Sequence, residues 1–499
     1  MYKNVYLWFI ITYLIHPSHT LCIIQDNGLC FFTITCQNPS VIAAEPFCNH
    51  GDMYITLTIH NSTVEEITPN FFASKLDPWI RIFNAIGYNW TVVHPFAFSN
   101  FKNVLYMDIS DNKINDIGPA FKDLKELDSL NLSRNRIEDI GPNTFYISNN
   151  VNRLYLLDLS YNRLTYLPDK AFQHLNNLRK LYLQGNQITV IENVWPKYLR
   201  SLDYLNLCCN NMSSLNTPLK YMKKLKEINL STNKIEHLNI SELISLETID
   251  LSHNKIKHFR FDYFDKIPHF MKLDLSYNKI TKLKREKAKR KVSNDINTPL
   301  RSVKLDFKHN HISYIDKNFF LTFNYIRYLI LRSNKITILH PGTFKHVRVL
   351  RFLDISSNTL KLDDQTFRGL KKTEIIDISK NNIFVLKAAF FKGCVRLTKI
   401  VAIRNPIKSV NLREFKNTVP KLAKILLTPV SDSSYLQFIN ELLYIILEFL
   451  IDVVLTFVLF LLLFGILFLF IYIGLYRRII CYYILKCARS VMARNRRLK

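Results

Sequence analysis

One eleven-residue pattern recurs along most of this chain and limits what the chain can fold into. Its clearest copy runs from Leu154 to Leu164, with apolar residues at places 1, 4, 6 and 11 and asparagine at place 9. The pattern returns with its asparagine at thirteen positions: Asn112, Asn135, Asn162, Asn186, Asn210, Asn233, Asn254, Asn278, Asn310, Asn334, Asn358, Asn381 and Asn405. Most of the intervals are 23 or 24 residues. Repeats of this length indicate a stacked array of similar units rather than one globule.

The spacing predicts a short strand followed by a turn in every copy. Places 4 and 6 point to one face of a strand, and places 1 and 11 return to the same interior. An asparagine at the exit of the strand carries donors and an acceptor for backbone groups that would otherwise be buried unpaired. One coil cannot bury its own apolar face, so neighbouring coils must stack into a solenoid with a parallel sheet along its inner wall.

A second set of apolar residues follows most of the asparagines by nine or ten residues: Phe121, Phe145, Phe172, Phe264, Phe320, Phe344, Phe367 and Phe390. We expect these side chains to fill the outer side of each coil. Residues 49–100 hold two degraded copies, one with a strand at Tyr54–Ile59 and one that we expect to end at Asn89. One further coil, which lacks the asparagine and contains Phe415, follows Asn405.

This pattern resembles the typical extracellular class of the leucine-rich repeat family, and the resemblance covers about two-thirds of the chain. It implies an α/β-type solenoid, a horseshoe with a parallel β-sheet on the concave face, over residues 49–430. Such ectodomains bind proteins along the solenoid, so a protein ligand is expected here too.

The N-terminal region has the features of a secreted protein. Residues 1–20 read as a signal peptide, with a single Lys3 before an apolar run that is too short to span a bilayer. Residues 21–48 contain four cysteines: Cys22, Cys30, Cys36 and Cys48. We predict that they form a disulfide-linked cap over the open edge of the first coil, with three pairings possible.

The C-terminal region predicts one transmembrane helix. Residues 453–475 contain no charged side chain and, as a helix, would be roughly 34 Å long. A juxtamembrane segment, 431–452, precedes them, and a basic tail, 476–499, follows. The positive charges place this tail in the cytoplasm and the repeats outside the plasma membrane. Cys481 and Cys487 are candidate palmitoylation sites, with plain reduced thiols as the alternative.

Residues 282–299 form a basic insertion between Asn278 and Asn310. It predicts a solvated loop, and a proprotein-convertase site at 287–290 or a contact for an anionic ligand are the alternatives. Eight of the positive charges behind the net charge of +27 lie in the basic tail, and this loop adds another local excess. Membrane topology and a basic loop explain this charge better than nucleic-acid binding, so we expect no nucleic-acid partner.

The chain lacks the sequence signatures of hydrolases, metalloproteases and nucleotide-binding enzymes, so we expect no catalysis and no cofactor. Seven aspartates at place 5 predict an acidic column on the inner wall: Asp108, Asp158, Asp250, Asp274, Asp306, Asp354 and Asp377. His253 and His309, both at place 8, read as solvent-exposed residues, with a metal-binding or pH-sensing pair as the alternative.

The remaining extracellular cysteines and the N-glycosylation sequons complete the candidate residues outside the membrane. Cys208, Cys209 and Cys394 read as buried thiols, with a disulfide-linked dimer or complex as the alternative. Six sequons suit N-glycosylation: Asn61, Asn89, Asn131, Asn211, Asn229 and Asn239.

Two patches on the inner wall are candidate ligand sites. The first is a tyrosine group: Tyr155, Tyr161, Tyr182 and Tyr204. The second is basic and aromatic: Lys304, Lys308, Arg327, Tyr328, Arg332, Arg351 and Phe352. Tyrosine suits interface hot spots, and the basic patch suits an acidic protein or glycan surface.

We therefore predict a cell-surface protein that binds an extracellular or cell-surface protein in adhesion, recognition or as a co-receptor, and that can form a homo-oligomer. The alternative is a relative of Toll-like innate-immune receptors that acts as a decoy or a partner-dependent subunit, because the tail has no room for a signalling domain.

Overall fold

The computed structural model describes residues 22–27, 31–36, 54–59, 65–68, 79–146, 152–189, 195–215, 219–285 and 303–427. The chain divides into two compact units, Met1–Leu427 and Thr428–Lys499, and all described residues belong to the first. The predicted signal peptide, Cys30, Cys48, Asn61, most of the basic insertion and everything after residue 427, including Cys481 and Cys487, lie outside the described residues. Within the described ranges, no helix is both long enough and apolar enough to cross a membrane.

Each coil contributes one strand to a single sheet, which has 18 strands in the part of the chain described. These strands are β1 Cys22–Asp26, β2 Phe31–Cys36, β3 Tyr54–Ile59, β5 Ile80–Asn84, β7 Tyr106–Asp108, β8 Ser129–Asn131, β9 Leu156–Asp158, β10 Lys180–Tyr182, β11 Tyr204–Asn206, β13 Glu227–Asn229, β15 Thr248–Asp250, β16 Lys272–Asp274, β18 Val303–Asp306, β20 Ile326–Ile330, β21 Phe352–Asp354, β22 Ile375–Asp377, β23 Lys399–Ala402 and β24 Lys424–Leu427. All neighbouring pairs are parallel except β1 with β2. The predicted parallel-strand solenoid is confirmed.

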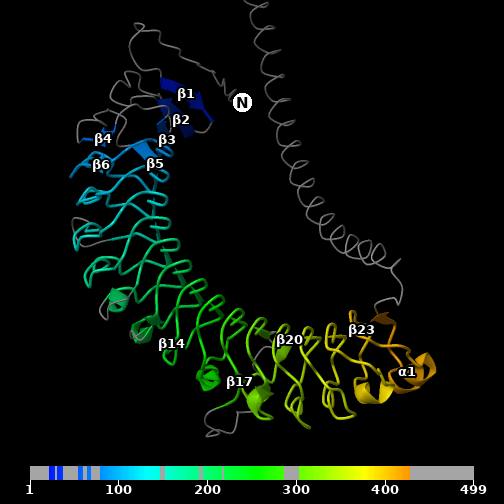
Figure 1. The fold of residues 1–499 in the computed structure, drawn as a ribbon. Helices are drawn as coiled ribbons and strands as arrows, with labels where there is room; N and C mark the ends of the chain where they lie inside the picture. Colours follow the sequence, from blue (N-terminus) through cyan, green and yellow to red (C-terminus); the bar gives the residue numbers. More distant parts are fainter. Residues whose placement is uncertain are drawn as a thin grey trace, which may run out of the picture. The chain divides into compact units, whose positions relative to one another are not determined.

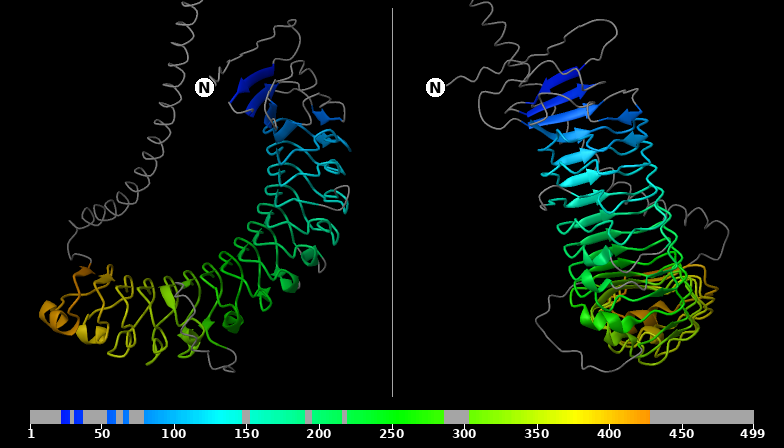
Figure 2. Two further views of the ribbon diagram at one scale, coloured as in Figure 1. Left: turned by 180° about the vertical axis from the view of Figure 1, so that it is seen from behind. Right: turned by 90° about the vertical axis from the view of Figure 1, so that its left-hand side faces the viewer.

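The coils stack along a curve, with strands such as β5, β20 and β23 on its inner side (Figure 1). Short two-stranded pairs lie on the outer side: β4 Glu66–Ile67 with β6 Val92–Val93, β12 Ser214–Leu215 with β14 His237–Leu238, and β17 Lys282–Leu283 with β19 Tyr314–Ile315. Helical segments also lie on the connecting side of the coils: 3-10 turns at Trp195–Lys197, Leu219–Tyr221, Phe261–Lys266, Phe319–Leu321 and Ala388–Phe391, and α1 at Leu412–Thr418. Figure 2 shows the strands side by side along the stack.

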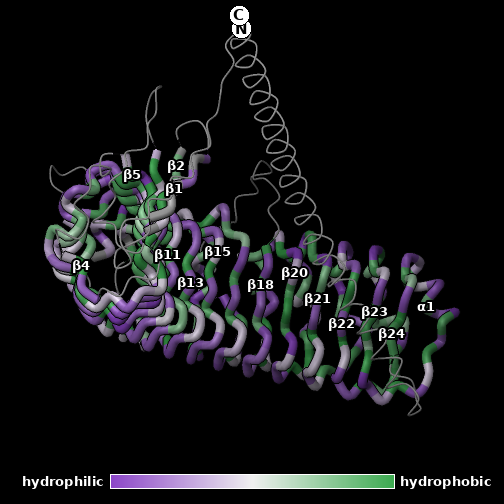
Figure 3. The backbone as a smooth tube through the Cα atoms, turned by 90° about the horizontal axis from the view of Figure 1, so that it is seen from above, coloured by the Kyte–Doolittle hydropathy of each residue, from purple (hydrophilic) through white to green (hydrophobic). Residues whose placement is uncertain are grey.

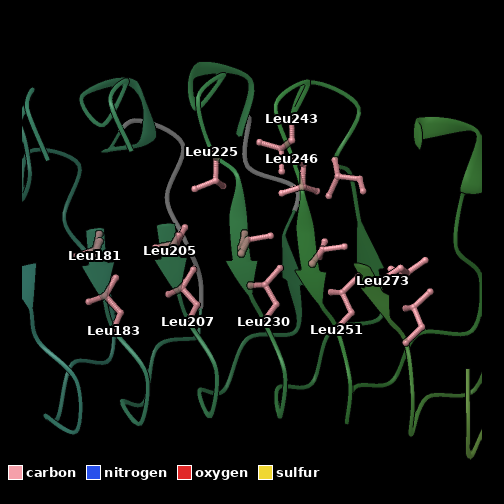
Figure 4. Packing of buried hydrophobic residues seen from close by; sticks show 14 of the residues in the cluster. Leu181, Leu183, Leu205, Leu207, Leu225, Leu230, Leu243, Leu246, Leu251 and Leu273 are labelled. Atoms are coloured by element: carbon pink, nitrogen blue, oxygen red, sulfur yellow. The ribbon is translucent and has the colours of Figure 1, made fainter. Parts of the chain in front are cut away.

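The interior is built from the four apolar places of the pattern. In the clearest copy, Leu154 at place 1 is 2% exposed, and Leu157, Leu159 and Leu164 at places 4, 6 and 11 are fully buried. Leucines of successive coils pack against one another in the same layer (Figure 4). Along each coil, hydrophilic and hydrophobic segments alternate (Figure 3). Fully burying one such side chain stabilises the fold by about 1.5–3 kcal/mol.

The repeated asparagines link each coil to the one before it. Asn162 donates from Nδ2 to the carbonyls of Leu159 in its own coil and Leu132 in the preceding coil, at 3.1 and 3.0 Å. Its Oδ1 accepts the N–H of Ile137, also in the preceding coil, at 3.0 Å. All thirteen asparagines of the pattern donate in this way to a carbonyl of the coil before. We call this arrangement the asparagine ladder.

The degraded coil that contains β5 has no asparagine at place 9. Counted from Phe83 at place 4, place 9 of this coil is Tyr88, and the expectation that the coil ends at Asn89 was wrong. The Tyr88 hydroxyl donates to the carbonyl of Ile59, which is the place-6 carbonyl that an asparagine would reach. Asn89 is exposed. A tyrosine therefore supplies the inter-coil hydrogen bond here.

The two ends of the sheet are formed differently. At the first coil, β1 and β2 make an antiparallel hairpin that continues the sheet beyond β3. Cys22 lies directly opposite Cys36 in this register. Residues opposite each other have Cα atoms about 4.5–5.5 Å apart, which is the range that a disulfide needs; the disulfide itself stays a prediction. At the other end, β24 adds the expected final coil, with Phe415 buried.

The phenylalanine column is present, with one correction. Phe98, Phe121, Phe145 and Phe172 stack ring on ring, with centroids 6.0, 6.4 and 6.3 Å apart. Near the C-terminal end the fully buried member is Phe391, which stacks between Phe367 and Phe415. Phe390 is only partly buried, because the 3-10 turn at Ala388–Phe391 directs the next residue inward.

The basic insertion starts later than its sequence suggests. Lys282 and Leu283 form β17 and pair with β19 of the next coil, and Leu283 is buried. The side chain of Arg285 is 4% exposed and forms an ion pair with Asp265. On either side of the insertion, β16 and β18 are direct neighbours. The sheet is therefore continuous across the insertion.

We predict that Asn162→Ala lowers the free energy of unfolding by about 2–3 kcal/mol, because it leaves buried carbonyls and one buried N–H without their partner. Chemical denaturation of the full chain in detergent, followed by circular dichroism, measures the change. The matched control is Asn176→Ala at an exposed position, with a change within about 0.5 kcal/mol. Equal effects of the two substitutions would contradict a structural role for the ladder.

Candidate binding surface

The inner face of the sheet consists of rows, because the register joins the same place of successive coils. Tyr204 at place 3 pairs with Glu227, and Asn206 at place 5 pairs with Asn229. We use "inner face" for places 2, 3, 5 and 7, and "rim" for place 8, which follows the strand. Strand neighbours lie about 4.8 Å apart, so side chains in one row are within contact distance.

The aspartates at place 5 accept hydrogen bonds from the turn that follows the strand. Ser110 donates its backbone N–H to Asp108 Oδ1 at 3.0 Å, and Ser133 donates to Asn131 Oδ1 at 3.0 Å. Aspartate and asparagine are thus interchangeable at this place, as expected for a side chain that closes a local turn. Burial raises the pKa of Asp158, Asp306 and Asp377. The acidic column is therefore structural, and in the described ranges no group of three His, Cys, Asp or Glu could hold a metal ion.

The rim has left-handed backbone in every repeat of the pattern. Place 8 has φ between +52° and +58° in the coils with side chains there, and +70° at Gly185. The rim residues are Asp111, Arg134, Tyr161, Gly185, Cys209, Thr232, His253, Tyr277, His309, Ser333, Ser357, Lys380 and Arg404. This conformation costs a non-glycine residue on the order of 1 kcal/mol. The turn places successive rim side chains close enough to stack.

The four predicted tyrosines do not form one patch. Tyr182 and Tyr204 come together, with ring centroids 5.1 Å apart. Burial, and then the neighbouring Tyr182, raises the pKa of Tyr204. Tyr155 precedes its strand, with Lys180 Nζ 5.9 Å from its ring, and Tyr161 follows the same strand on the rim. We keep the name "tyrosine pair" for Tyr182 and Tyr204.

Tyr155 instead lines a hollow of about 490 Å³ at the edge of the inner face. Its lining residues are Tyr106, Asp128, Ser129, Arg153, Tyr155, Leu156 and Asn177. Tyr106, which is 50% exposed, was not among the candidates, although counting back from Asn112 puts it at place 3. A second hollow of about 520 Å³ lies along the rim and includes Arg134 and Tyr161.

Two sets of rim side chains stack across three successive coils. The Tyr161 ring lies beside the backbone of Gly185 on one side, with the Arg134 guanidinium 5.1 Å from its centroid. Farther along, Tyr277 lies between His253 and His309, with centroid distances of 4.1 and 4.3 Å. Burial, and then Arg332 and Lys308, lowers the pKa of His309. The two histidines are thus separated by a ring and do not form a metal-binding pair.

The basic and aromatic candidates lie in adjoining coils. Lys304, Tyr328 and Phe352 are consecutive neighbours at place 3. The row extends to residues that were not candidates: Lys272 before them, and Ile375, Lys399 and Lys424 after them. Arg327 and Arg351 lie beside this row at place 2. We call Lys272, Lys304, Tyr328, Phe352, Lys399 and Lys424 the basic row.

Positive charge is concentrated beside the basic row. At place 7, Lys308 and Arg332 stand where most coils have serine, and Ile330 replaces the usual aspartate in the coil of Arg332. Lys308 Nζ is 3.8 Å from Asp306, and Arg351 Nε is 3.7 Å from Glu374. Among the described residues, Lys304 and Arg332 form no salt bridge. Two cations are thus left for a partner of negative charge.

The sequons within the described residues lie in different surroundings. Asn89, Asn211 and Asn239 are exposed. Asn131 is half-buried on the inner face, and its Nδ2 donates to Asp108 at 2.8 Å. Asn229 is also on the inner face and accepts from Ser231 at 3.0 Å. Glycosylation stays a prediction at all of them.

The comparisons with known proteins agree with this geometry. A family model described as leucine rich repeat matches residues 88–137, 125–188, 177–235, 200–256 and 300–360. Lumican of Gallus gallus is 29% identical over 213 residues, 41% of this chain and 58% of lumican. The chain thus spans under two thirds of that relative's length. Leucine-rich repeat-containing G-protein coupled receptor 5 of Rattus norvegicus is 35% identical over 96 residues, 19% of this chain and 10% of the receptor.

Solved structures share the fold at low identity. The leucine-rich repeat domain of APL1 superposes with a TM-score of 0.51 at 19% identity, covering 79% of this chain and 93% of that domain. The Toll–Spatzle complex of Drosophila gives a TM-score of 0.52 at 18% identity, covering 83% of this chain and 65% of that chain. A leucine-rich repeat protein of Leptospira interrogans gives 0.52 at 19%, covering 75% and 89%. These likenesses concern the fold alone.

We predict that Gly185→Ala lowers the free energy of unfolding by about 2 kcal/mol, because an added Cβ would lie 2.5 Å from Cδ1 of Tyr161. The control is Gly87→Ala, at the same place of another coil, where φ is +79° and nothing lies within 4 Å. Its cost is the backbone strain alone, about 1 kcal/mol.

In a Tyr161→Ala background, Gly185→Ala should cost no more than the Gly87 control, because the clash is gone. Chemical denaturation of the four variants gives the values. If the cost of Gly185→Ala is the same with and without the Tyr161 ring, the ring does not pack on Gly185.

Proposed function

Because this chain is a leucine-rich repeat protein, we propose that it is a cell-surface protein that binds a protein ligand through the inner face of its solenoid. Its role would be adhesion, recognition or that of a co-receptor. The family consists of protein-interaction scaffolds that are typically not enzymes. The proposal places the repeats outside the plasma membrane, held by a helix at 453–475, with the basic tail in the cytoplasm.

The observation that carries the proposal is the composition of the inner face around β16–β24. Six of its place-3 residues are the lysines and aromatic residues of the basic row, which occupy neighbouring strands with one interruption, at Ile375 between Phe352 and Lys399. Tyr328 is 41% exposed and is not part of the buried core. An exposed tyrosine beside cations that form no salt bridge is typical of binding surfaces rather than of inert repeat faces.

The charge of this surface favours an acidic protein ligand. Lys304 and Arg332 form no salt bridge among the described residues, although their charges act on the nearby Asp306 and Asp377. Asp306 Oδ1 accepts the backbone N–H of Lys308 in the turn. Complementary charge speeds association and selects the partner. The tyrosine pair and the hollow at Tyr155 lie farther along the same face, where a large ligand would reach them as well.

We predict that the double charge reversal Lys304→Glu with Arg332→Glu weakens binding of the acidic ligand about tenfold or more, because two attractive contacts become repulsive. Cells display the full-length chain, surface proteins are cross-linked to it, and captured proteins are quantified by mass spectrometry. The control reverses the same number of charges at exposed place-10 lysines, Lys279→Glu with Lys335→Glu.

A ligand that the control retains and the inner-face variant loses supports the proposal. If both variants capture the same ligands equally well, the basic row is not the binding site.

The same cells test the topology, since a tag after residue 20 must be stained on intact cells and a C-terminal tag only after permeabilisation. Aggregation between two differently labelled populations of these cells would identify a second copy of the chain as the ligand.

A further inference from the structure

Cys208 and Cys209 bring two thiols together on the edge of the inner face. They occupy places 7 and 8 of the coil that contains β11, and their Sγ atoms are 3.0 Å apart. Cys209 is exposed and Cys208 is half-buried. The expectation of buried thiols was therefore wrong for Cys209 and also for Cys208, which is only half-buried, whereas Cys394 is buried as expected and lies far along the stack.

The backbone on both sides of the pair is fixed by hydrogen bonds to neighbouring coils. Gly185 donates to the Cys208 carbonyl at 3.1 Å, and Cys209 donates to the Ser231 carbonyl at 3.0 Å. The Cys208 N–H donates to Asn206 Oδ1 at 3.1 Å. Cys209 has the left-handed conformation common to the rim, with φ of +58°. The two thiols are thus held side by side by the same frame that orders every coil.

The fold does not itself require sulfur at these places. Place 7 is serine in most coils, and place 8 accepts aspartate, arginine, tyrosine, threonine, histidine and glycine. Neither thiol fills the core, since both lie on the solvent side of the sheet. Their proximity therefore points to chemistry between them.

We propose that Cys208 and Cys209 are a thiol-oxidation site that closes reversibly to a disulfide between adjacent residues. The oxidant is a small-molecule disulfide such as oxidised glutathione. The Cys209 thiolate attacks one glutathione sulfur, forms a mixed disulfide and releases one glutathione thiolate. Cys208 then loses its proton to solvent and attacks the Cys209 sulfur, which releases the second glutathione. Two protein thiols are oxidised, and one glutathione disulfide is reduced to two thiols.

The surroundings of the two sulfur atoms set this order. Burial, and then the hydrogen bond with Cys209, raises the pKa of Cys208 to about 12. A thiol of such high pKa is almost wholly protonated and a poor first nucleophile. Cys209, which is exposed, meets the oxidant first. Cys208 acts within the mixed disulfide, where its short distance to the target sulfur compensates for its low thiolate fraction.

The adjacency of the two residues makes the bond easy to reduce. Neighbouring Cα atoms are about 3.8 Å apart, below the usual range of about 4.4–6.8 Å for a disulfide. Strained and exposed disulfides are the labile ones. The site is therefore reversible, unlike the structural disulfides predicted for the N-terminal cap. It also adjoins the tyrosine pair, because Tyr204 belongs to the same coil.

The test uses the full chain in detergent, incubated with oxidised glutathione, alkylated, deglycosylated and cleaved with trypsin. Residues 201–220 form one tryptic peptide that contains both cysteines and no other. We expect this peptide without alkyl groups and two hydrogens lighter, and restored to the dialkylated form by mild treatment with reduced glutathione. In Cys208→Ser, Cys209 should instead keep one glutathione. Cys394 serves as the internal reference for a buried thiol.

Complete alkylation of both cysteines after oxidation would overturn the proposal. So would a stable glutathione on Cys209 in the wild-type chain, because it would show that Cys208 does not react. A disulfide-linked dimer that Cys209→Ser abolishes would also overturn it, and would assign Cys209 to a contact between two chains. A disulfide within the peptide that resists reduced glutathione would refute the reversibility.

Discussion

The hydrogen bonds of the asparagine ladder are the interaction on which the remainder of this structure depends. Each asparagine donates to carbonyls at the exit of its own strand. It also donates to a carbonyl and accepts an N–H in the preceding coil, where these groups lie outside the strand pairing. It thereby fixes the spacing between coils at the point where the chain turns. The parallel sheet, the left-handed rim and the rows of the inner face all follow from that fixed spacing.

The same frame explains why the surface can vary. With places 1, 4, 6, 9 and 11 committed to the interior, and place 5 in most coils to the turn, places 2, 3 and 7 can change without altering the core. Place 7 is serine in most coils, yet it is lysine or arginine at Lys308 and Arg332 and cysteine at Cys208. Such changes in neighbouring coils add up to a surface, because the register keeps equal places adjacent. A binding face can therefore be built without altering the core.

Much of the fold could be predicted from the sequence, because strand alternation and stacking leave few choices for a repeat of this length. The failures have two causes, a partner that lies in another coil and the local geometry of a turn. Nothing in the residue itself shows that Tyr88 would replace an asparagine, and a 3-10 turn shifts the buried ring from Phe390 to Phe391. The aspartates of place 5 were predicted as an acidic column, but the sequence alone did not show that each accepts a backbone N–H of the turn that follows.

The sequence identifies the candidate residues, but it shows only in part which of them lie next to one another in the structure. Tyr155 and Tyr161 are close in sequence but flank opposite ends of one strand, whereas Tyr182 and Tyr204 meet across two strands. Counting places alone would have found Tyr106 and the remaining members of the basic row. The distance between the thiols of Cys208 and Cys209 depends on the rim conformation, which the sequence does not show.

Hydrogen exchange of the full chain, resolved at single amides, tests the role of the ladder most directly. The N–H groups of Ile137, Leu164 and Ile188 lie outside the strands and donate to the asparagine of the following coil at 3.0 Å. If the ladder holds the coils together, these amides exchange as slowly as those of β9 and β10, because opening them requires separating two coils. Exchange at the rate of exposed turns would contradict the account.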